Sequence, residues 1–243
     1  MASDTTCNLS TLDPYIPDAT NPWNVTKIHH LYRRIAFGAS KAEVISALSM
    51  NPSNLVDMLI DNAIALNTTA EPLWAFWTRD DFEAAEDANE DNNTGFYFNE
   101  GKAQMVNDMV NNKVRDRLTI FWSNHFVTQD QEYPSPAYQY QYYNLLQLHA
   151  LGNFRDFTYD IGICNAMLVY LNGDENVANR PNENYARELY ELFTMGVDNN
   201  YTEDDVQETS KALTGYVDTN DIRWGDILFN ACLLYTSPSP RDA

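Results

Sequence analysis

Apolar residues recur along most of the chain at the three- and four-residue spacing that is typical of amphipathic helices. In the stretch 27–37, for example, Ile28, Leu31, Tyr32 and Ile35 share one face, and Gly38 follows as an end signal. With Ser, Thr, Asn and Pro as start signals, the pattern predicts helices over 27–37, 41–49, 52–63, 72–77, 101–126, 138–150, 154–171, 182–195 and 203–214. This pattern predicts a mainly α protein, folded as a multi-helix globular bundle.

The rest of the chain contains few periodic segments. Residues 216–229 alternate between apolar and polar positions around turn residues, which predicts a short C-terminal β-hairpin. The acidic, Asn-rich stretch 80–94 is expected to be a solvated helix end and a loop. Residues 1–25 carry three prolines with little periodicity and are expected to form an extended lead-in.

Residues 26–230 show no repeat and no change in composition, so we expect one helical domain. The last dozen residues (CLLYTSPSPRDA) depart from the acidic, aromatic character of everything before them and are similar to a translated sequencing adaptor. We therefore expect residues 231–243 to be a non-native tail, and the helical domain to be incomplete at its C-terminus.

Charge narrows the classes of partner. The chain has 35 acidic and 15 basic residues, a formal net charge of −20, which argues against nucleic-acid binding and against adhesion to anionic membranes. No apolar run is long enough to span a bilayer, and the first residues lack the basic and apolar blocks of a secretory signal. A protein, a glycan or a cation remains open as a partner, and the oligomeric state is not indicated.

Common catalytic templates are missing from the sequence. It contains no GxSxG turn, no GxxxxGK[S/T] phosphate loop and no GxGxxG dinucleotide turn. It also lacks the HExxH and CxxC spacings that are typical of metal sites. The sequence therefore identifies no cofactor and no metal.

The predicted helix 182–195 has a core face and a polar face. Tyr185, Ala186, Leu189, Leu192 and Phe193 share the core face. Polar residues occupy the rest of the surface as two stripes: Asn184, Glu188 and Glu191 form one, and Glu183, Arg187 and Thr194 form the other. Two interpretations remain open: an exposed helix with ion pairs at four-residue spacing, or a cleft where two carboxylates share protons or hold a cation.

His125 lies on an apolar stripe with Leu118 and Trp122, which favours a core histidine with a satisfied hydrogen bond. The alternative is a general acid/base or a metal ligand beside Asn124. In an enzymatic hypothesis His125, Glu188 and Glu191 are catalytic, in a hydrolase-like or metal-assisted reaction, and Asn184 and Arg187 orient them.

Three separated segments together resemble the domain of unknown function 1800 family: HHLYRRIAFGAS (29–40), LTIFWSNHF (118–126), and a long segment from MLVYLNGDEN to SKALTGY (167–216). The resemblance implies a large helical domain, found mainly in bacterial proteins, many of them exported, with no established activity. It carries over candidate binding residues in all three segments: Arg34, Asn124, Asn182, Glu183, Asn184, Arg187 and Asp205.

Two departures from the family pattern are visible: Tyr190 stands where methionine is frequent, and Tyr216 where tryptophan is usual. The family segment with histidine and lysine that follows the hairpin is also missing. We favour an extracytoplasmic structural or interaction domain, with the enzymatic hypothesis and a cation-binding domain as alternatives.

Overall fold

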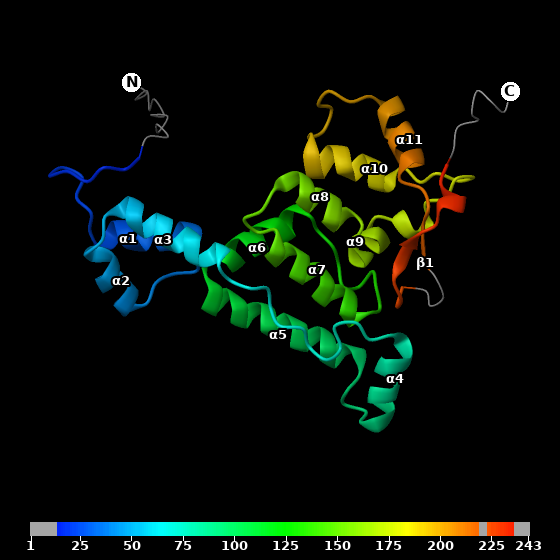
Figure 1. Ribbon diagram of the computed structural model, residues 1–243, viewed down its shortest axis with the longest axis horizontal. Helices are drawn as coiled ribbons and strands as arrows, with labels where there is room; N and C mark the ends of the chain where they lie inside the picture. Colours follow the sequence, from blue (N-terminus) through cyan, green and yellow to red (C-terminus); the bar gives the residue numbers. More distant parts are fainter. Residues whose placement is uncertain (1–13, 219–222, 236–243) are drawn as a thin grey trace, which may run out of the picture.

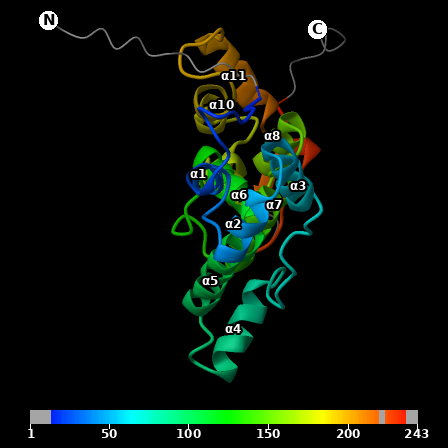
Figure 2. The same ribbon diagram turned by 90° about the vertical axis from the view of Figure 1, so that its left-hand side faces the viewer.

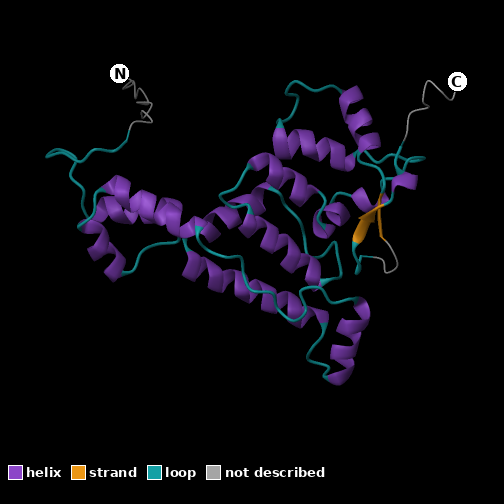
Figure 3. Ribbon diagram, in the orientation of Figure 1, coloured by secondary structure: helices purple, strands orange, loops and turns teal. Residues whose placement is uncertain are grey.

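A computed structural model describes residues 14–218 and 223–235 of the chain. Helices make up most of it, as Figure 3 shows. The helices are α1 (Val25–Ile35), α2 (Lys41–Leu48), α3 (Pro52–Ile64), α4 (Arg79–Ala88), α5 (Thr94–Asn112), α6 (Val114–His125), α7 (Pro136–Leu148), α8 (Phe154–Gly162), α9 (Asn165–Tyr170), α10 (Asn184–Glu188) and α11 (Glu203–Ala212). Short turns of other helix types are η1 (Gly173–Glu175), η2 (Leu189–Thr194) and η3 (Ala231–Leu233). The predicted mainly α class is confirmed.

The predicted C-terminal hairpin is also present. β1 (Tyr216–Asp218) pairs antiparallel with β2 (Ile227–Phe229), with Val217 opposite Leu228. Ile227 is buried against the largest core cluster. The hairpin is thereby attached to the helical body.

Helix α7 is the centre of the molecule (Figure 1). It packs against α5, α6, α8 and α9, and it is buried on nearly every side. Its tyrosines serve different clusters: Tyr138 and Tyr142 belong to the largest core, whereas Tyr140 packs with Trp74 and Tyr97 in a smaller aromatic core. In Figure 1 α1–α3 lie at one end of the molecule and the hairpin at the other, and Figure 2 shows α4 and α11 far apart along the vertical direction.

A separate core holds α1 to α3 together and attaches them to α6. Ile28 and Tyr32 of α1 are buried with Leu55 of α3 and with Val114, the first residue of α6. Each buried aliphatic or aromatic side chain of this kind contributes about 1.5–3 kcal/mol. This packing sets α1 beside α6, and their exposed faces together form the groove described below.

Local end signals in the sequence act as expected. Ser40 and Glu43 form a reciprocal capping box at α2, and Asn51 caps α3 with Pro52 as its first residue. Thr202 and Asp205 form a second capping box at α11. Helix starts were therefore readable from short-range chemistry.

Two predicted helices are wrong in their extent because each is divided into two shorter helices, the first at a residue that is neither proline nor glycine and the second just after Gly162. The expected helix 101–126 is α5 followed by α6, which are separated at Lys113, a residue with φ of 50°. The expected helix 154–171 is likewise α8 and α9, separated at residues 163 and 164. In both cases packing of the two halves on α7 replaces straight continuation.

The stretch 72–94 also differs from expectation. Residues 72–77 form a turn rather than a helix, because Trp74 is drawn into the aromatic core with Tyr97 and Tyr140. In the acidic stretch 80–94, expected to be a helix end and a loop, residues 80–88 belong to the helix α4, whose Phe82 is buried in the same core, and residues 89–93 form the expected loop. A single buried aromatic side chain thus anchors a helix that is otherwise highly polar.

The predicted helix 182–195 changes type within its length. It begins as α10 and continues as the π-helical segment η2, which is wider per turn. Leu192 is consequently rotated out of the core and is 59% exposed, whereas Tyr185, Ala186 and Phe193 are buried as expected. The assignment of Leu192 to the core face is therefore wrong.

The two ends of the chain are described only in part. Residues 14–24 contain no helix or strand, and residues 1–13 of the expected lead-in lie outside the described residues. Near the other end, the carbonyl of Leu233 accepts from Ala178 N at 3.2 Å, and Tyr235 N donates to Thr214 Oγ1 at 2.6 Å. Residues 236–243 of the expected tail lie outside the described part.

Candidate binding site

Arg187 is the centre of an ion-pair group on α10. Its guanidinium contacts both carboxylate oxygens of Glu203 on α11, at 2.5 and 3.1 Å, and Glu183 at 3.1 Å. Glu191 lies 3.6 Å away on the next turn. The bidentate contact links α10 to α11, so the guanidinium of Arg187 is neutralised by carboxylates of the protein itself.

Three further predicted binding residues make local backbone contacts. Asn182 Oδ1 accepts from Asn184 N at 2.9 Å, and Asn184 Nδ2 donates to Leu171 O at 3.2 Å. Asp205 Oδ2 accepts from the backbone and the hydroxyl of Thr202 at the start of α11. These contacts give Asn182, Asn184 and Asp205 structural roles.

Glu188 and Glu191 lie close to each other on the same segment, and both are half-buried. Burial raises the pKa of Glu188, the charge of Glu191 acts in the same direction, and Arg187 opposes both. Such a pair can exchange a proton with an adjacent group.

His125 lies in an aromatic surrounding. Its Nε2 is 2.9 Å from the carbonyl oxygen of Phe193 and donates to it, and the rings of Trp122, Phe126 and Phe154 pack around the imidazole. No hydrogen bond or ion pair within residues 14–218 and 223–235 joins His125 to Glu188 or Glu191. The contacts of His125 are those of a core histidine, and its catalytic role stays a prediction.

Arg34 and Asn124, predicted from two different sequence segments, come together. Both line a groove of about 440 Å³ between the end of α1 and the outer face of α6. Arg33 of α1 and Arg117 of α6 line the same groove. The shared core of α1, α3 and α6 fixes these two helices side by side, so the groove is a direct result of the fold.

The groove has a basic rim and an apolar floor. Arg33, Arg34 and Arg117 are exposed, and in the described ranges none of them forms an ion pair with a carboxylate. The floor is made of aliphatic and aromatic side chains: Ile35, Ile60, Val114, Leu118, Ile120 and Phe121. Phe121 is 57% exposed, so its ring is accessible at the groove.

Sequence reasoning missed Arg117 and Phe121 as site residues. They precede Asn124 by seven and three positions, so that 117, 121 and 124 share one face of α6. A helical-wheel projection of α6 would have identified this shared face from the sequence. That Arg33 and Arg34 of α1 lie opposite follows from tertiary packing and is not visible in the sequence.

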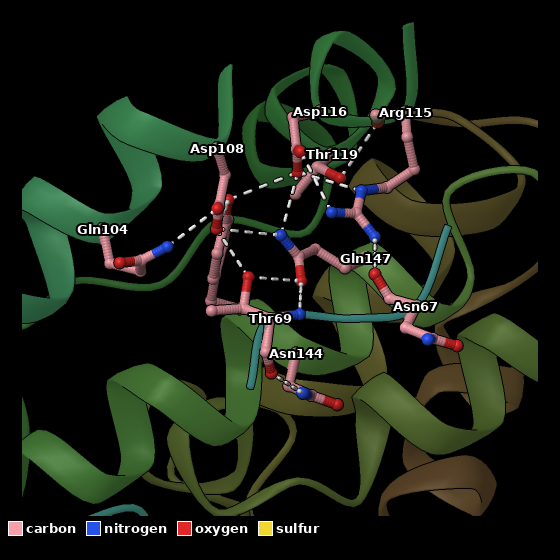
Figure 4. A network of polar contacts seen from close by, with 10 residues as sticks. Asn67, Thr69, Gln104, Asp108, Arg115, Asp116, Thr119, Asn144 and Gln147 are labelled. Carbon is pink, nitrogen blue, oxygen red and sulfur yellow. Dashed lines mark hydrogen bonds and ion pairs between the residues drawn. The ribbon is translucent and has the colours of Figure 1, made fainter. Parts of the chain in front are cut away.

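A buried polar network, also missed, ties together α5, α6, α7 and the loop before residue 70 (Figure 4). Asp116 Oδ1 accepts from Arg115 Nε at 3.1 Å and from Gln147 Nε2 at 2.9 Å. Asp108 accepts from Gln104 at 2.8 Å and from the Thr69 hydroxyl at 2.5 Å. Because every carboxylate here has several donors, the network reads as structural.

Comparison with known proteins identifies the family. The model of a family described as a protein of unknown function, DUF1800, matches residues 30–236. The chain belongs to the DUF1800 family. No curated protein and no solved structure matches the DUF1800 chain.

Two of the three family-like segments of this DUF1800 chain come together, and the third lies apart from them. The first and second segments meet at the α1–α6 groove, which contains Arg34 and Asn124. The third forms α10, η2 and α11, where its charged residues pair with one another. The candidate binding site of this DUF1800 chain is therefore the groove between α1 and α6.

Two further observations concern metals and membranes. Across the described part of the chain, no group of three His, Cys, Asp and Glu side chains is placed to hold a metal ion. None of the helices that the structure describes is both long and apolar enough to cross a bilayer.

Proposed function

We propose that this DUF1800 chain is an interaction domain, and that its α1–α6 groove binds an acidic peptide segment of a partner protein. The observation that carries the proposal is the position of Arg33, Arg34 and Arg117 around one apolar floor. All three guanidinium groups are free of carboxylate partners among the described residues, in a chain whose formal net charge is −20.

Electrostatics supports an acidic partner. Three arginines elsewhere in the structure are paired with carboxylates: Arg115 with Asp116, Arg187 with three glutamates, and Arg223 with Asp174. Three like charges around one groove repel each other, and an anionic ligand relieves that repulsion. Arginine also binds carboxylates in a bidentate geometry, which gives orientation as well as affinity.

The apolar floor supports a peptide rather than a small anion. Phe121 and the aliphatic residues beside it offer a surface that a bare phosphate or acetate would leave uncovered. Phe37, 43% exposed, lies under the Arg117 guanidinium at 5.6 Å from its ring centroid. A segment that alternates acidic and apolar side chains satisfies both the rim and the floor.

The test is fluorescence polarisation with a fluorescein-labelled peptide in which glutamate alternates with leucine and phenylalanine. Reversing the charges in Arg34→Glu/Arg117→Glu removes charge-assisted hydrogen bonds and adds repulsion, so we expect the Kd to rise by at least about 100-fold. Phe121→Ala removes only floor contacts, and we expect a rise of about tenfold.

The control is Arg155→Glu, which makes the same kind of charge reversal once, at an exposed residue of α8 outside the groove, whereas the groove variant makes it twice. We expect its Kd to stay within about twofold of wild type, because an isolated exposed charge interacts weakly over distance. An equal loss in this control, or no binding of the peptide by the wild-type protein, would show the proposal to be wrong.

The enzymatic and cation-binding hypotheses stay predictions. A turnover that Glu188→Ala abolishes, with the circular-dichroism spectrum unchanged, would favour the enzymatic one. Calorimetric uptake of calcium, zinc or manganese would favour the other. Export, which the family resemblance implies, is likewise a prediction, and fractionation of cells that express the protein tests it.

A further inference from the structure

A second cavity, of about 520 Å³, lies between the segment 14–24 and the helices α1 and α3. Its size falls within the range of about 300–1,000 Å³ that is typical of small-molecule sites. Of the residues that line the α1–α6 groove, only Arg34 also lines this cavity. The rest of its lining is separate from the groove, so ligand binding here does not require the peptide site proposed above.

Two aromatic rings contribute to the lining of this cavity. Tyr15 and Trp23 are both half-buried, and their ring centroids lie 6.1 Å apart with an interplanar angle of 46°. The Tyr15 hydroxyl donates to Asn21 O at 2.7 Å, and Trp23 Nε1 donates to Ala47 O at 2.9 Å. Because the polar atoms of both side chains are bonded within the protein, the rings offer apolar surface to a ligand.

The segment that carries these rings is held in place by local hydrogen bonds. Asp18 Oδ1 accepts from the backbone N of Thr20 at 2.8 Å, and from the Thr20 hydroxyl and Asn21 N at 2.7 Å. Asn24 then caps the start of α1 by accepting from Lys27 N at 3.1 Å. The aromatic part of the lining is therefore already formed without a ligand, which lowers the entropic cost of binding.

The side of the cavity that α1 contributes is basic. Lys27, His30 and Arg34 recur at three- and four-residue spacing, and all three line the cavity. Within residues 14–218 and 223–235 none of their side chains forms a hydrogen bond or an ion pair, although the Lys27 ammonium lies 5.4 Å from the centroid of the Tyr15 ring. Each of the three carries at least one N–H donor, so together they can hold an anion.

The charge around the cavity suits a singly charged anion. Lys27 and Arg34 contribute two positive charges, and Asp57 of α3 contributes one negative charge. A monoanion balances the remaining positive charge. A dianion such as a phosphate monoester meets stronger repulsion from Asp57, because the repulsion grows with the charge of the ligand.

We propose that this cavity binds a small aromatic carboxylate. The carboxylate accepts hydrogen bonds from Lys27, His30 and Arg34 on α1. The aromatic ring of the ligand lies against Tyr15 and Trp23. Arginine can hold a carboxylate through two parallel hydrogen bonds, and ring contacts add attraction beyond the burial of apolar area. A bare carboxylate leaves the rings uncovered, and a neutral aromatic molecule leaves the cations without a partner.

The experiment is isothermal titration calorimetry of the full chain with sodium 2-naphthoate. Three further probes separate the features of the ligand. Acetate keeps the carboxylate without the ring, 2-naphthalenemethanol keeps the ring without the charge, and 2-naphthyl phosphate carries a second charge. We expect saturable heat with 2-naphthoate, a Kd at least about tenfold higher for acetate and the alcohol, and a higher Kd for the phosphate. Binding of any of the three as tight as that of 2-naphthoate would overturn the proposal.

Lys27→Gln removes a half-buried cation from the lining and should weaken 2-naphthoate binding by about tenfold. The matched control is Lys41→Gln, the same change at an exposed residue of α2 that lines neither the cavity nor the groove, and its Kd should stay within about twofold of wild type. Asp57→Asn should act in the opposite direction and tighten binding by about twofold, because it removes the anion beside the ligand. Equal losses in the two lysine variants, or weaker binding by Asp57→Asn, would contradict the proposed site.

A blocking variant separates this site from the peptide groove. Ser53 is exposed and lines the cavity, so Ser53→Trp fills the space without removing a core side chain. We expect it to abolish 2-naphthoate binding with the circular-dichroism spectrum retained. Neither Ser53 nor Lys27 lines the α1–α6 groove, so both variants should bind the fluorescein-labelled peptide as the wild type does. No heat with 2-naphthoate in a wild-type protein that binds the peptide, or undiminished 2-naphthoate binding by Ser53→Trp, would overturn this inference alone.

Discussion

At the residue scale, Asp116 shows how a charge can be buried in this fold. Its side chain is fully buried, and it accepts from Arg115, Gln147 and Tyr143. Replacing it by alanine leaves the buried guanidinium of Arg115 without its counter-charge. We expect Asp116→Ala to lower the free energy of unfolding by about 3–5 kcal/mol, measured by urea denaturation.

The control for this prediction is Glu208→Ala. Glu208 pairs with Lys211 at 2.6 Å, but it is exposed, so we expect a change within about 0.5 kcal/mol. Asp116→Asn should fall between the two, because the amide keeps part of the hydrogen bonding and loses the charge. A loss below about 1 kcal/mol for Asp116→Ala would mean that the network is not what holds α6 and α7 together.

Individual residues of the candidate groove were predictable only in part. Arg34 and Asn124 entered through resemblance to the family, and Asn124 could have led to Arg117 through helical spacing. The sequence also grouped His125 with Glu188 and Glu191. In the described structure no hydrogen bond or ion pair joins His125 to either glutamate.

At the element scale, the boundary between α5 and α6 is a backbone feature that the sequence does not announce. Lys113 has φ of 50°, in the region that glycine tolerates and other residues rarely adopt. Its ammonium group forms an ion pair with Glu43 of the α2 capping box. The side chain thus contributes a contact at a position where its backbone is strained.

These two effects can be separated by substitution. Lys113→Ala removes the ion pair and keeps the strain, whereas Lys113→Gly removes both. We therefore expect Lys113→Gly to be more stable than Lys113→Ala by about 1–2 kcal/mol in chemical denaturation. If the alanine variant is the more stable of the two, the residue is not strained and the break between α5 and α6 has another cause.

Element starts were more predictable than element ends or continuity. Capping residues such as Ser40, Asn51 and Thr202 act through neighbouring amides, so short-range sequence suffices. The break at Lys113 and the π-helical segment η2 depend on what each half packs against. The turn at 72–77 likewise depends on tertiary packing, because Trp74 is buried in a core whose other members are distant in sequence.

At the scale of the whole molecule, a group of exposed arginines and an acidic helix start lie in different places. The arginines lie where α1 meets α6, and the acidic first turn of α11 lies in another part of the molecule (Figure 1). Between them lies a core that is rich in tyrosine. Four of its members, Tyr133, Tyr142, Tyr143 and Tyr185, are buried.

This tyrosine core predicts loss of stability at alkaline pH. Burial raises the pKa of Tyr133 to about 12, and it raises the pKa values of Tyr142, Tyr143 and Tyr185 further above their usual 10.0. Above pH 10 the unfolded chain ionises its tyrosines while the folded chain holds them neutral, so the unfolded state binds fewer protons. The free energy of unfolding must then fall as pH rises, by up to about 1.4 kcal/mol per pH unit for each tyrosine.

Urea denaturation from pH 8 to pH 11 measures this fall, and Tyr142→Phe isolates one contribution to it. The Tyr142 hydroxyl donates to Phe126 O at 2.7 Å, so the variant is expected to be somewhat less stable at pH 8. Its slope above pH 10 should nevertheless be shallower than that of the wild type, because one titrating group is gone. A slope unchanged by Tyr142→Phe, or a wild-type stability that stays level through pH 11, would contradict the idea that burial of neutral tyrosines holds the centre of this fold together.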